Sequence, residues 1–211
     1  MIHQNKYTFS FTGASAMITE TLIIAEAFLI LNDWYIVLKN LTDSNSLNKI
    51  KHVTFKREFS EIKKRISLLT NEQLQILVNG SSDDSKAIIL LSIVKSYTFI
   101  YEFISEVILN KYLLFDRSLT DADYIKFVNN KMLSHPELEN ITESTQKKVK
   151  QVVFKILEQV NLITNTKNGI IIKPILNKDV LASIISDNPT FLTAFLCSSE
   201  EIKIINSNGQ F

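Results

Sequence analysis

Residues 142–176 read TESTQKKVKQVVFKILEQVNLITNTKNGIIIKPIL, and the spacing of their apolar residues changes halfway along. Thr142 or Ser144 is suited to cap a helix, with Glu143 in its first turn. Because its apolar residues recur at i, i+3, i+4 and i+7, the first half predicts an amphipathic helix over Thr142–Val160. The residues expected on its buried face are Val149, Val152, Val153, Ile156, Leu157 and Val160.

The second half of this stretch has a different pattern. Leu162, Ile163 and the isoleucines at 170–172 flank a polar turn that ends in Asn168-Gly169, a strong short-range signal for a β-hairpin. Upstream, a helix is expected from Thr120 to a stop before Pro136. The order helix, Pro-containing turn, basic helix and hairpin predicts a winged-helix-like segment over 120–176.

Composition points to helices elsewhere in the chain. Only 4 glycines and 3 prolines occur in 211 residues, and 45% of the residues are hydrophobic. Few turn residues and ample apolar surface favour long helices around a sizeable core. We therefore predict an all-α, compact multi-helix globular fold with helix-turn-helix-like elements and a short C-terminal β-hairpin wing. The chain is expected to be a single domain over 1–211, either undivided or built from two halves, 1–80 and 81–211.

A second basic helix is predicted near the N-terminal end. Its apolar residues, from Phe55 through Ile62 to Leu69, recur every three or four positions over Val53–Leu69. Residues 49–65 carry seven Lys or Arg against two Glu. The short helix expected at 47–51, a turn and this basic helix fit a helix-turn-helix pattern, which makes the region a second candidate binding surface.

The remaining elements are predicted from the same periodicity. Residues 83–114 should form a long helical region with a break near 96–98, whose aromatic residues belong to the core and not to a base-stacking surface. An extended arm is expected over Tyr7–Phe11, and residues 206–211 should fray. Further helices are expected at 14–31, 34–41, 70–78 and 178–186 and from Pro189 onward, with 202–205 left open.

The sequence holds no recognisable catalytic or metal-binding motif. It has no Walker loop, no dinucleotide fingerprint and no nucleophile elbow. His3, His52 and His135 are far apart in sequence, and no pair has metal-ligand spacing. No enzyme activity, cofactor or metal is therefore expected. The single cysteine, Cys197, fits a reducing compartment, and no apolar run reaches the roughly 20 residues of a membrane span. A cytoplasmic protein is expected.

The basic helices and the hairpin supply the candidate DNA contacts. The net charge is only +1, so any nucleic-acid surface must come from local clusters of basic residues. Lysine and arginine neutralise phosphates, and glutamine can donate to and accept from base edges. The same lysines could instead dock an acidic protein surface. The candidate residues are Lys56, Arg57, Lys63, Lys64, Arg65, Gln146, Lys147, Lys148, Lys150, Gln151, Lys155, Lys167 and Lys173.

Several segments, taken in order, carry a family likeness. They read KYTFSFTGAS, ITETLIIAE, NDW, LLTNEQLQILVNG, YTFIYEFISEVILNKYLLFD and HPELENITESTQKKVKQVVFKIL. Over about Lys6–Leu176 the chain resembles the BrxA family, components of BREX (bacteriophage exclusion) defence systems. The resemblance implies a small, all-helical cytoplasmic protein that binds double-stranded DNA, works with other BREX proteins and has no catalytic residues of its own. An alternative is a protein-interaction adaptor that assembles other BREX subunits without touching DNA.

Overall fold

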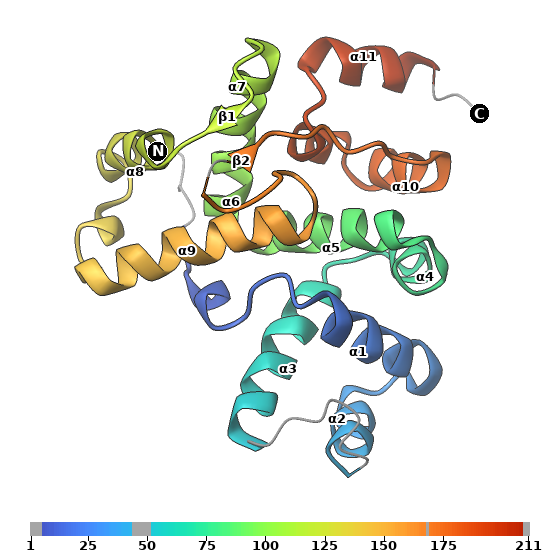
Figure 1. The fold of residues 1–211 in the computed structure, drawn as a ribbon. Helices are drawn as coiled ribbons and strands as arrows, with labels where there is room; N and C mark the ends of the chain where they lie inside the picture. The colour runs from blue at the N-terminus through green and yellow to red at the C-terminus, as the bar shows by residue number, and fades with distance from the viewer. Residues whose placement is uncertain (1–5, 44–51, 168, 209–211) are drawn as a thin grey trace.

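The computed structural model describes residues 6–43, 52–167 and 169–208. Most of these residues are helical, which confirms the predicted fold class (Figure 1). The helix expected at 47–51 lies outside the described residues. The α-helices are α1 (Ile18–Leu31), α2 (Trp34–Asp43), α3 (His52–Ile66), α4 (Asn71–Asn79), α5 (Ser82–Ser96), α6 (Thr98–Phe103), α7 (Leu109–Leu113), α8 (Asp121–Met132), α9 (Glu143–Gln159), α10 (Lys178–Asp187) and α11 (Ser199–Asn208).

Shorter elements complete the chain. In the part of the chain that the structure describes, three segments are 3-10 helical: η1 (Ser10–Gly13), η3 (Pro136–Leu138) and η4 (Pro189–Phe195). The segment η2 (Ile104–Ile108) is π-helical and continues α6 into α7. Within the described residues there are two short strands, β1 (Ser118–Leu119) and β2 (Gly169–Ile170). Residues 202–205, for which no element was predicted, are helical and belong to α11. The prediction that the chain frays from Asn206 is wrong for residues 206–208, which also belong to α11.

Helix α5 lies at the centre of the core. Every residue from Ala87 to Val94 is buried. The helix contacts α1, α3 and α4 on one side and α6, α10 and η4 elsewhere (Figure 1). A helix that is apolar all round needs neighbours on every face, as here. The buried apolar side chains from both halves of the chain form one contiguous cluster. The division into two subdomains stays a prediction.

The break expected near 96–98 is confirmed at Tyr97, which is extended and separates α5 from α6. Among the described residues, no single helix is long and apolar enough to cross a membrane. The segments Ser82–Ser96 and Thr98–Leu113 meet the length and composition criteria only as a pair, and that pair is bent by 113° at the break.

The N-terminal segment, residues 6–17, differs from the prediction, and we call it the strap. The expected extended arm becomes helical at η1, and the helix expected from Ala14 begins only at Ile18. Ala14 is extended, and Met17 adopts a left-handed conformation with φ of 50°. Local apolar spacing favoured a helix here, but tertiary hydrogen bonds hold the backbone of residues 14–16 in an open form.

The predicted helix, turn, helix and hairpin of the C-terminal half are all present. A reciprocal capping box between Thr120 and Asp123 starts α8, and Pro136 starts η3 after α8 ends. The hydroxyl of Thr142 accepts a hydrogen bond from the Thr145 backbone N–H at 3.3 Å and caps α9. At the other end of α9, Asn161 has φ of 61° and turns the chain.

The chain then doubles back, which confirms the predicted hairpin pairing. Ile163 and Ile171 form an antiparallel bridge. The Ile172 N–H donates to the Leu162 carbonyl at 2.9 Å, and the Thr164 N–H donates to the Ile170 carbonyl at 3.1 Å. Asn168 lies outside the described residues. Strand β1, just before α8, pairs antiparallel with β2, and this pairing was not predicted.

Candidate nucleic-acid interface

Helix α9 presents one polar face to solvent. Its apolar residues, including Val149, Val153 and Ile156, are buried, as the sequence spacing predicted. The opposite side is an exposed stripe at helical spacing. We call this the α9 stripe, and it consists of Ser144, Lys147, Lys148, Gln151 and Lys155.

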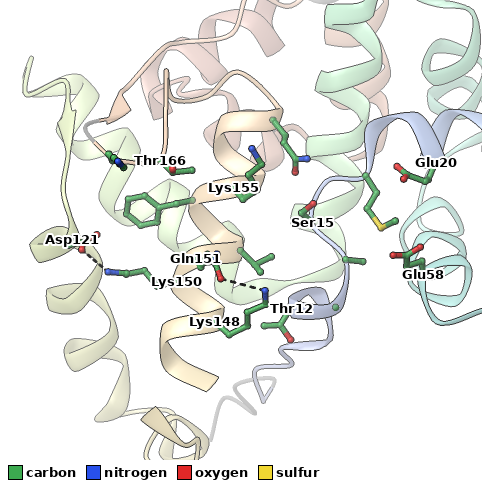
Figure 2. A pocket seen from close by; sticks show the side chains of 17 residues that line it. Thr12, Ser15, Glu20, Glu58, Asp121, Lys148, Lys150, Gln151, Lys155 and Thr166 are labelled. Carbon is green, nitrogen blue, oxygen red and sulfur yellow. Dashed lines mark hydrogen bonds and ion pairs between the residues drawn. The ribbon is translucent and has the colours of Figure 1, made fainter. Parts of the chain in front are cut away.

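A cleft of about 850 Å³ runs between α9 and the strap. Lys148, Gln151 and Lys155 line it from α9. The facing wall is the strap, from Thr12 to Ser15 together with Met17. In Figure 2, Lys148 and Gln151 face Thr12, whereas Lys150 points the other way, toward Asp121.

The hairpin turn also contributes to the lining of this cleft. Thr166 and Lys167 lie in the turn between the paired strands and line the cleft. Beyond the strap, Glu20 from α1 and Glu58 from α3 also line it (Figure 2). The cleft is therefore polar, with its lysines on α9 and on the hairpin and two of its carboxylates on the far side of the strap.

Two lysines of the cleft are already ion-paired. Lys150 Nζ lies 2.6 Å from an Asp121 carboxylate oxygen, and Lys155 Nζ lies 2.6 Å from one of Glu158. Lys148 reaches only the Gln151 side-chain carbonyl, at 3.5 Å. No ion pair is found for Lys148 or Lys167 within the part of the chain that the structure describes. Exposed pairs of this kind contribute about 0–1 kcal/mol to stability, so Lys150 and Lys155 can exchange partners readily.

The second predicted cluster, on α3, reaches the same strap from the other side. Lys64 Nζ lies 3.5 Å from the Ser10 hydroxyl and 4.5 Å from the centre of the Tyr97 ring. Arg57 packs on Gly13, where a Cβ atom would lie 3.4 Å from Arg57 Nε. The strap thus lies between the two basic helices, and the structure brings parts of both clusters to one region.

Other α3 residues behave differently from one another. Lys56 is exposed, as a DNA contact requires. Lys63 is half-buried, and its Nζ lies 5.6 Å from the centre of the Trp34 ring. Arg65 corrects the prediction of a surface contact, because its side chain is only 1% exposed. Its guanidinium donates to the carbonyls of Ser15 at 2.6 Å and Ala14 at 2.5 Å.

Three candidates at other places lie outside the cleft. Lys173 pairs with Glu201 of α11 at 2.6 Å and borders a different cavity. Lys147 pairs with Glu143 at 2.6 Å, and the Gln146 side chain donates to the Ile141 carbonyl at 3.5 Å. Gln146 and Lys147 border a smaller apolar cavity of about 260 Å³ between α8 and α9.

The sequence did not predict the strap wall of the cleft. Thr12, Gly13 and Ser15 are small residues with no charge pattern to mark them. Gln159 was also missed, although its side-chain carbonyl accepts a hydrogen bond from the Ala16 N–H at 3.0 Å. The one signal that could have marked the strap was Gly13, which is unusual in a chain with so few glycines.

Within the described residues, no group of three or more His, Cys, Asp or Glu side chains could hold a metal ion. Cys197 is buried, and burial raises the pKa of its thiol above the ordinary value. A thiol in such surroundings stays protonated and is a poor nucleophile.

These features define a mostly helical protein in which a basic helix and a short β-hairpin border a polar cleft. A family model described as BrxA matches residues 5–188. The chain is also 31% identical to the BREX protein BrxA of Bacillus cereus (strain H3081.97) over 149 residues, which are 70% of this chain and 72% of that protein. The chain belongs to the BrxA family, and the resemblance seen in its sequence is confirmed.

The fold also occurs in a solved structure. The crystal structure of an uncharacterized protein from Magnetospirillum magneticum superimposes with a TM-score of 0.77, covering 90% of this chain and 98% of that one. Sequence identity is 20%, so this likeness concerns the fold alone.

Proposed function

We propose that this chain is a non-enzymatic accessory protein of a BREX phage-defence system and that it binds double-stranded DNA through the α9 stripe and the hairpin turn. Membership of the BrxA family supports the BREX part of the proposal. One observation carries the DNA part: both predicted basic clusters adjoin the strap, and α9, with four lysines at 147, 148, 150 and 155, borders the cleft beside it.

The order and pairing of the C-terminal elements support a winged-helix interpretation. Helix α7, strand β1, helices α8 and α9 and the hairpin follow one another, and β1 pairs with the returning strand β2. In helix-turn-helix proteins the second helix of the pair enters the major groove, and here that helix is α9. Lys167 in the hairpin turn would then contact the adjacent backbone, as a wing does.

The charge arrangement also suits a duplex lying along α9. Lys148, Lys155 and Lys167 would neutralise phosphates and release counterions, and Gln151 would read a base edge. Carboxylates of Glu20 and Glu58 lie beyond the strap and oppose phosphates on that side. The duplex should therefore rest on α9 and the hairpin, with Arg57 and Lys64 at its margin.

A charge-reversal experiment tests this proposal. Lys148, Lys155 and Lys167 would be changed together to Glu, and gel shifts with duplex DNA would be run at low and moderate salt. We expect salt-sensitive binding by the wild-type protein and its loss in the triple variant. The matched control reverses Lys39, Lys178 and Lys203, which are exposed on α2, α10 and α11 and change the net charge equally. Equal loss in both variants would contradict a site at the cleft.

A second candidate function is an adaptor that assembles other BREX subunits. The observation in its favour is the apolar cavity between α8 and α9, which is lined in part by Ile125, a residue that is 53% exposed. Exposed apolar surface of this kind often marks protein contacts. Recovery of BREX proteins with this chain after nuclease treatment, combined with no DNA binding by the purified chain, would favour the adaptor.

A further inference from the structure

The three strap residues Ala14, Ser15 and Ala16 are held from both basic helices at once. From α3, the Arg65 guanidinium donates to the Ala14 and Ser15 carbonyls at 2.5 and 2.6 Å. From α9, the Gln159 side chain accepts from the Ala16 N–H at 3.0 Å. Consecutive residues of the strap therefore tie α3 to α9.

We infer that Arg65 is a positioning residue that sets the separation of α3 and α9, and so decides whether both basic helices can contact one duplex. This inference rests on the proposed DNA-binding function. Arg65 itself does not contact DNA in this proposal, because its side chain is 1% exposed and both terminal nitrogens donate hydrogen bonds to carbonyls of the strap.

The geometry of Arg65 suits this role better than a lysine would. A guanidinium is a planar fork, so its two terminal nitrogens can reach two successive carbonyls together, whereas an ammonium group is a single point. The Arg65 guanidinium also lies 5.4 Å from the centre of the Tyr97 ring, and its Nε lies 3.9 Å from a Glu61 carboxylate oxygen. These contacts fix the plane of the fork.

Burying the charged Arg65 side chain costs desolvation free energy, which its contacts must offset. Desolvation lowers the pKa of Arg65 to about 10, although the nearby Glu61 carboxylate opposes the shift. The group therefore remains charged at neutral pH. Arg65 Nε is buried and has no hydrogen-bond partner among the described residues. The two carbonyls of the strap are the main compensation for burying this cation.

The other hydrogen bonds of residues 14–16 are local: the Ala14 N–H donates to the Phe11 carbonyl at 2.9 Å, and the Thr21 hydroxyl donates to the Ala16 carbonyl at 3.4 Å. The last turn of η1 ends at Gly13, and α1 begins at Ile18. Further along, Tyr7 is anchored separately: its N–H donates to Glu137 at 2.7 Å, and its hydroxyl donates to Glu102. Loss of the Arg65 hydrogen bonds would therefore loosen residues 14–16, at the wall of the cleft, and leave the strap anchored at Tyr7.

The spacing of the two helices can be measured without DNA. Ser60 on α3 and Ser144 in the first turn of α9 are exposed. Ser144 belongs to the α9 stripe, which does not affect this measurement because no DNA is present. Both would be changed to Cys for spin labelling, in a Cys197→Ala background, and the distance distribution between labels recorded. We expect one narrow distribution for otherwise wild-type protein and a broadened or shifted one for Arg65→Lys. An unchanged distribution would overturn the inference.

A second variant covers the case in which Arg65→Lys fails to fold. Gln159→Leu removes the tie from the α9 side while leaving Arg65 in place, and it should broaden the same distribution. The control is Lys56→Gln, an exposed change on α3, which should leave the distribution as in the wild type. If Gln159→Leu also left the distribution narrow, the strap would not set the spacing.

The salt dependence of DNA binding separates a positioning role from a direct contact. The plot of log K against log salt has a negative slope, and each lost phosphate contact reduces its steepness by about 0.9. Lys56→Gln should lower the steepness by about one contact. Arg65→Lys retains its charge, yet should lower the steepness by about three contacts, because Lys56, Arg57 and Lys64 lie on the same helix and move away together. A wild-type slope and affinity in Arg65→Lys, with the spacing disturbed, would overturn the inference.

The distance measurement and the DNA-binding measurement together distinguish failure of this inference from failure of the proposed function. If the wild-type protein bound no duplex DNA while Arg65→Lys still broadened the distance distribution, the proposed DNA function would fail and the spacing role of Arg65 would stand. A narrow distribution in both variants, with DNA binding intact, would remove the spacing role of Arg65 and leave the proposed DNA function standing.

Discussion

Lys148 and Gln151 lie one helical turn apart on the α9 stripe and have different chemistry. An ammonium group contacts phosphate whatever the base sequence, whereas an amide can discriminate between bases. We predict that Lys148→Ala weakens binding about equally across a panel of duplexes and reduces the steepness of the salt dependence by about 0.9. We predict that Gln151→Ala reduces discrimination within the panel, by about 1–3 kcal/mol at one base pair. Fluorescence anisotropy on the panel measures both effects, and identical profiles for the two variants would contradict this assignment.

Lys173 and Glu201 link the end of the hairpin to α11, and their pairing makes stability depend on pH. The Lys173 ammonium and the Ser198 N–H hold the pKa of the Glu201 carboxyl below its ordinary value. A lowered folded-state pKa adds stability above the unfolded pKa of about 4.3, and this stability is lost as pH falls through the folded value. Glu201→Gln should therefore cost up to about 1 kcal/mol near neutral pH, since the pair is partly exposed.

Urea unfolding of the wild type and Glu201→Gln across the acid range checks this prediction. The two curves should differ near neutral pH and converge at the lowest pH at which the protein still folds. A difference that grew on acidification would contradict the sign of the shift.

At the scale of elements, the hairpin depends on a glycine. A Cβ atom at Gly169 would lie 2.7 Å from the Asn165 carbonyl oxygen and 3.1 Å from Ile163 Cδ1. The first contact is with backbone and cannot be relieved by a side-chain rotation. We predict that Gly169→Ala costs about 1–3 kcal/mol in unfolding free energy, the usual range for forced overpacking. DNA affinity should fall with it, because Lys167 moves.

Gly13→Ala is the matched control for this change. A Cβ there would meet only the flexible Arg57 side chain, at 3.4 Å. Its effect on unfolding free energy should stay within about 0.5 kcal/mol. Equal destabilisation by the two variants in thermal or urea unfolding would show that the hairpin turn has no special need for glycine.

Periodicity predicted the elements whose structure depends on one buried face. Helix α9, the buried α5 and the hairpin return all follow from spacing and from turn residues within a few positions. The strap could not be predicted in this way, because Arg65 and Gln159, which hold its backbone, lie 51 and 143 residues away. Strand β1 has the same difficulty, since its two residues gain their structure only by pairing with β2.

The candidate site was predictable in its exposed half. Lys148, Gln151 and Lys155 lie opposite the apolar face of α9, so helical spacing alone places them in solvent. Arg65 lies three residues after Ile62 and just before Ile66, at the border of the buried face of α3. Its charge led to the prediction that it lies at the surface. In the structure it is buried, because the carbonyls of Ala14 and Ser15 accept hydrogen bonds from its guanidinium. Lys173 was likewise predicted as a DNA contact, whereas in the structure it forms an ion pair with Glu201 of α11.

At the scale of the whole molecule, the cleft joins both halves of the chain. The strap belongs to residues 1–80, and α9 and the hairpin belong to 81–211. Duplex DNA at about 100 times its Kd should add about 2.7 kcal/mol to the unfolding free energy. If the chain is a single cooperative domain, calorimetry should show one transition that moves upward as a whole. Two transitions, of which DNA moves only one, would contradict both the single-domain prediction and a cleft shared between the halves.

The most direct measurement is hydrogen exchange of the wild-type protein with and without saturating duplex DNA. We predict slower exchange in the strap at 10–17, in α9 and in the hairpin at 163–172, with smaller protection in α3. Helices α10 and α11, which do not line the cleft, should exchange as in the free protein. Protection confined to α10 and α11, or no protection at saturating DNA, would contradict a DNA-binding surface at the cleft between α9 and the strap.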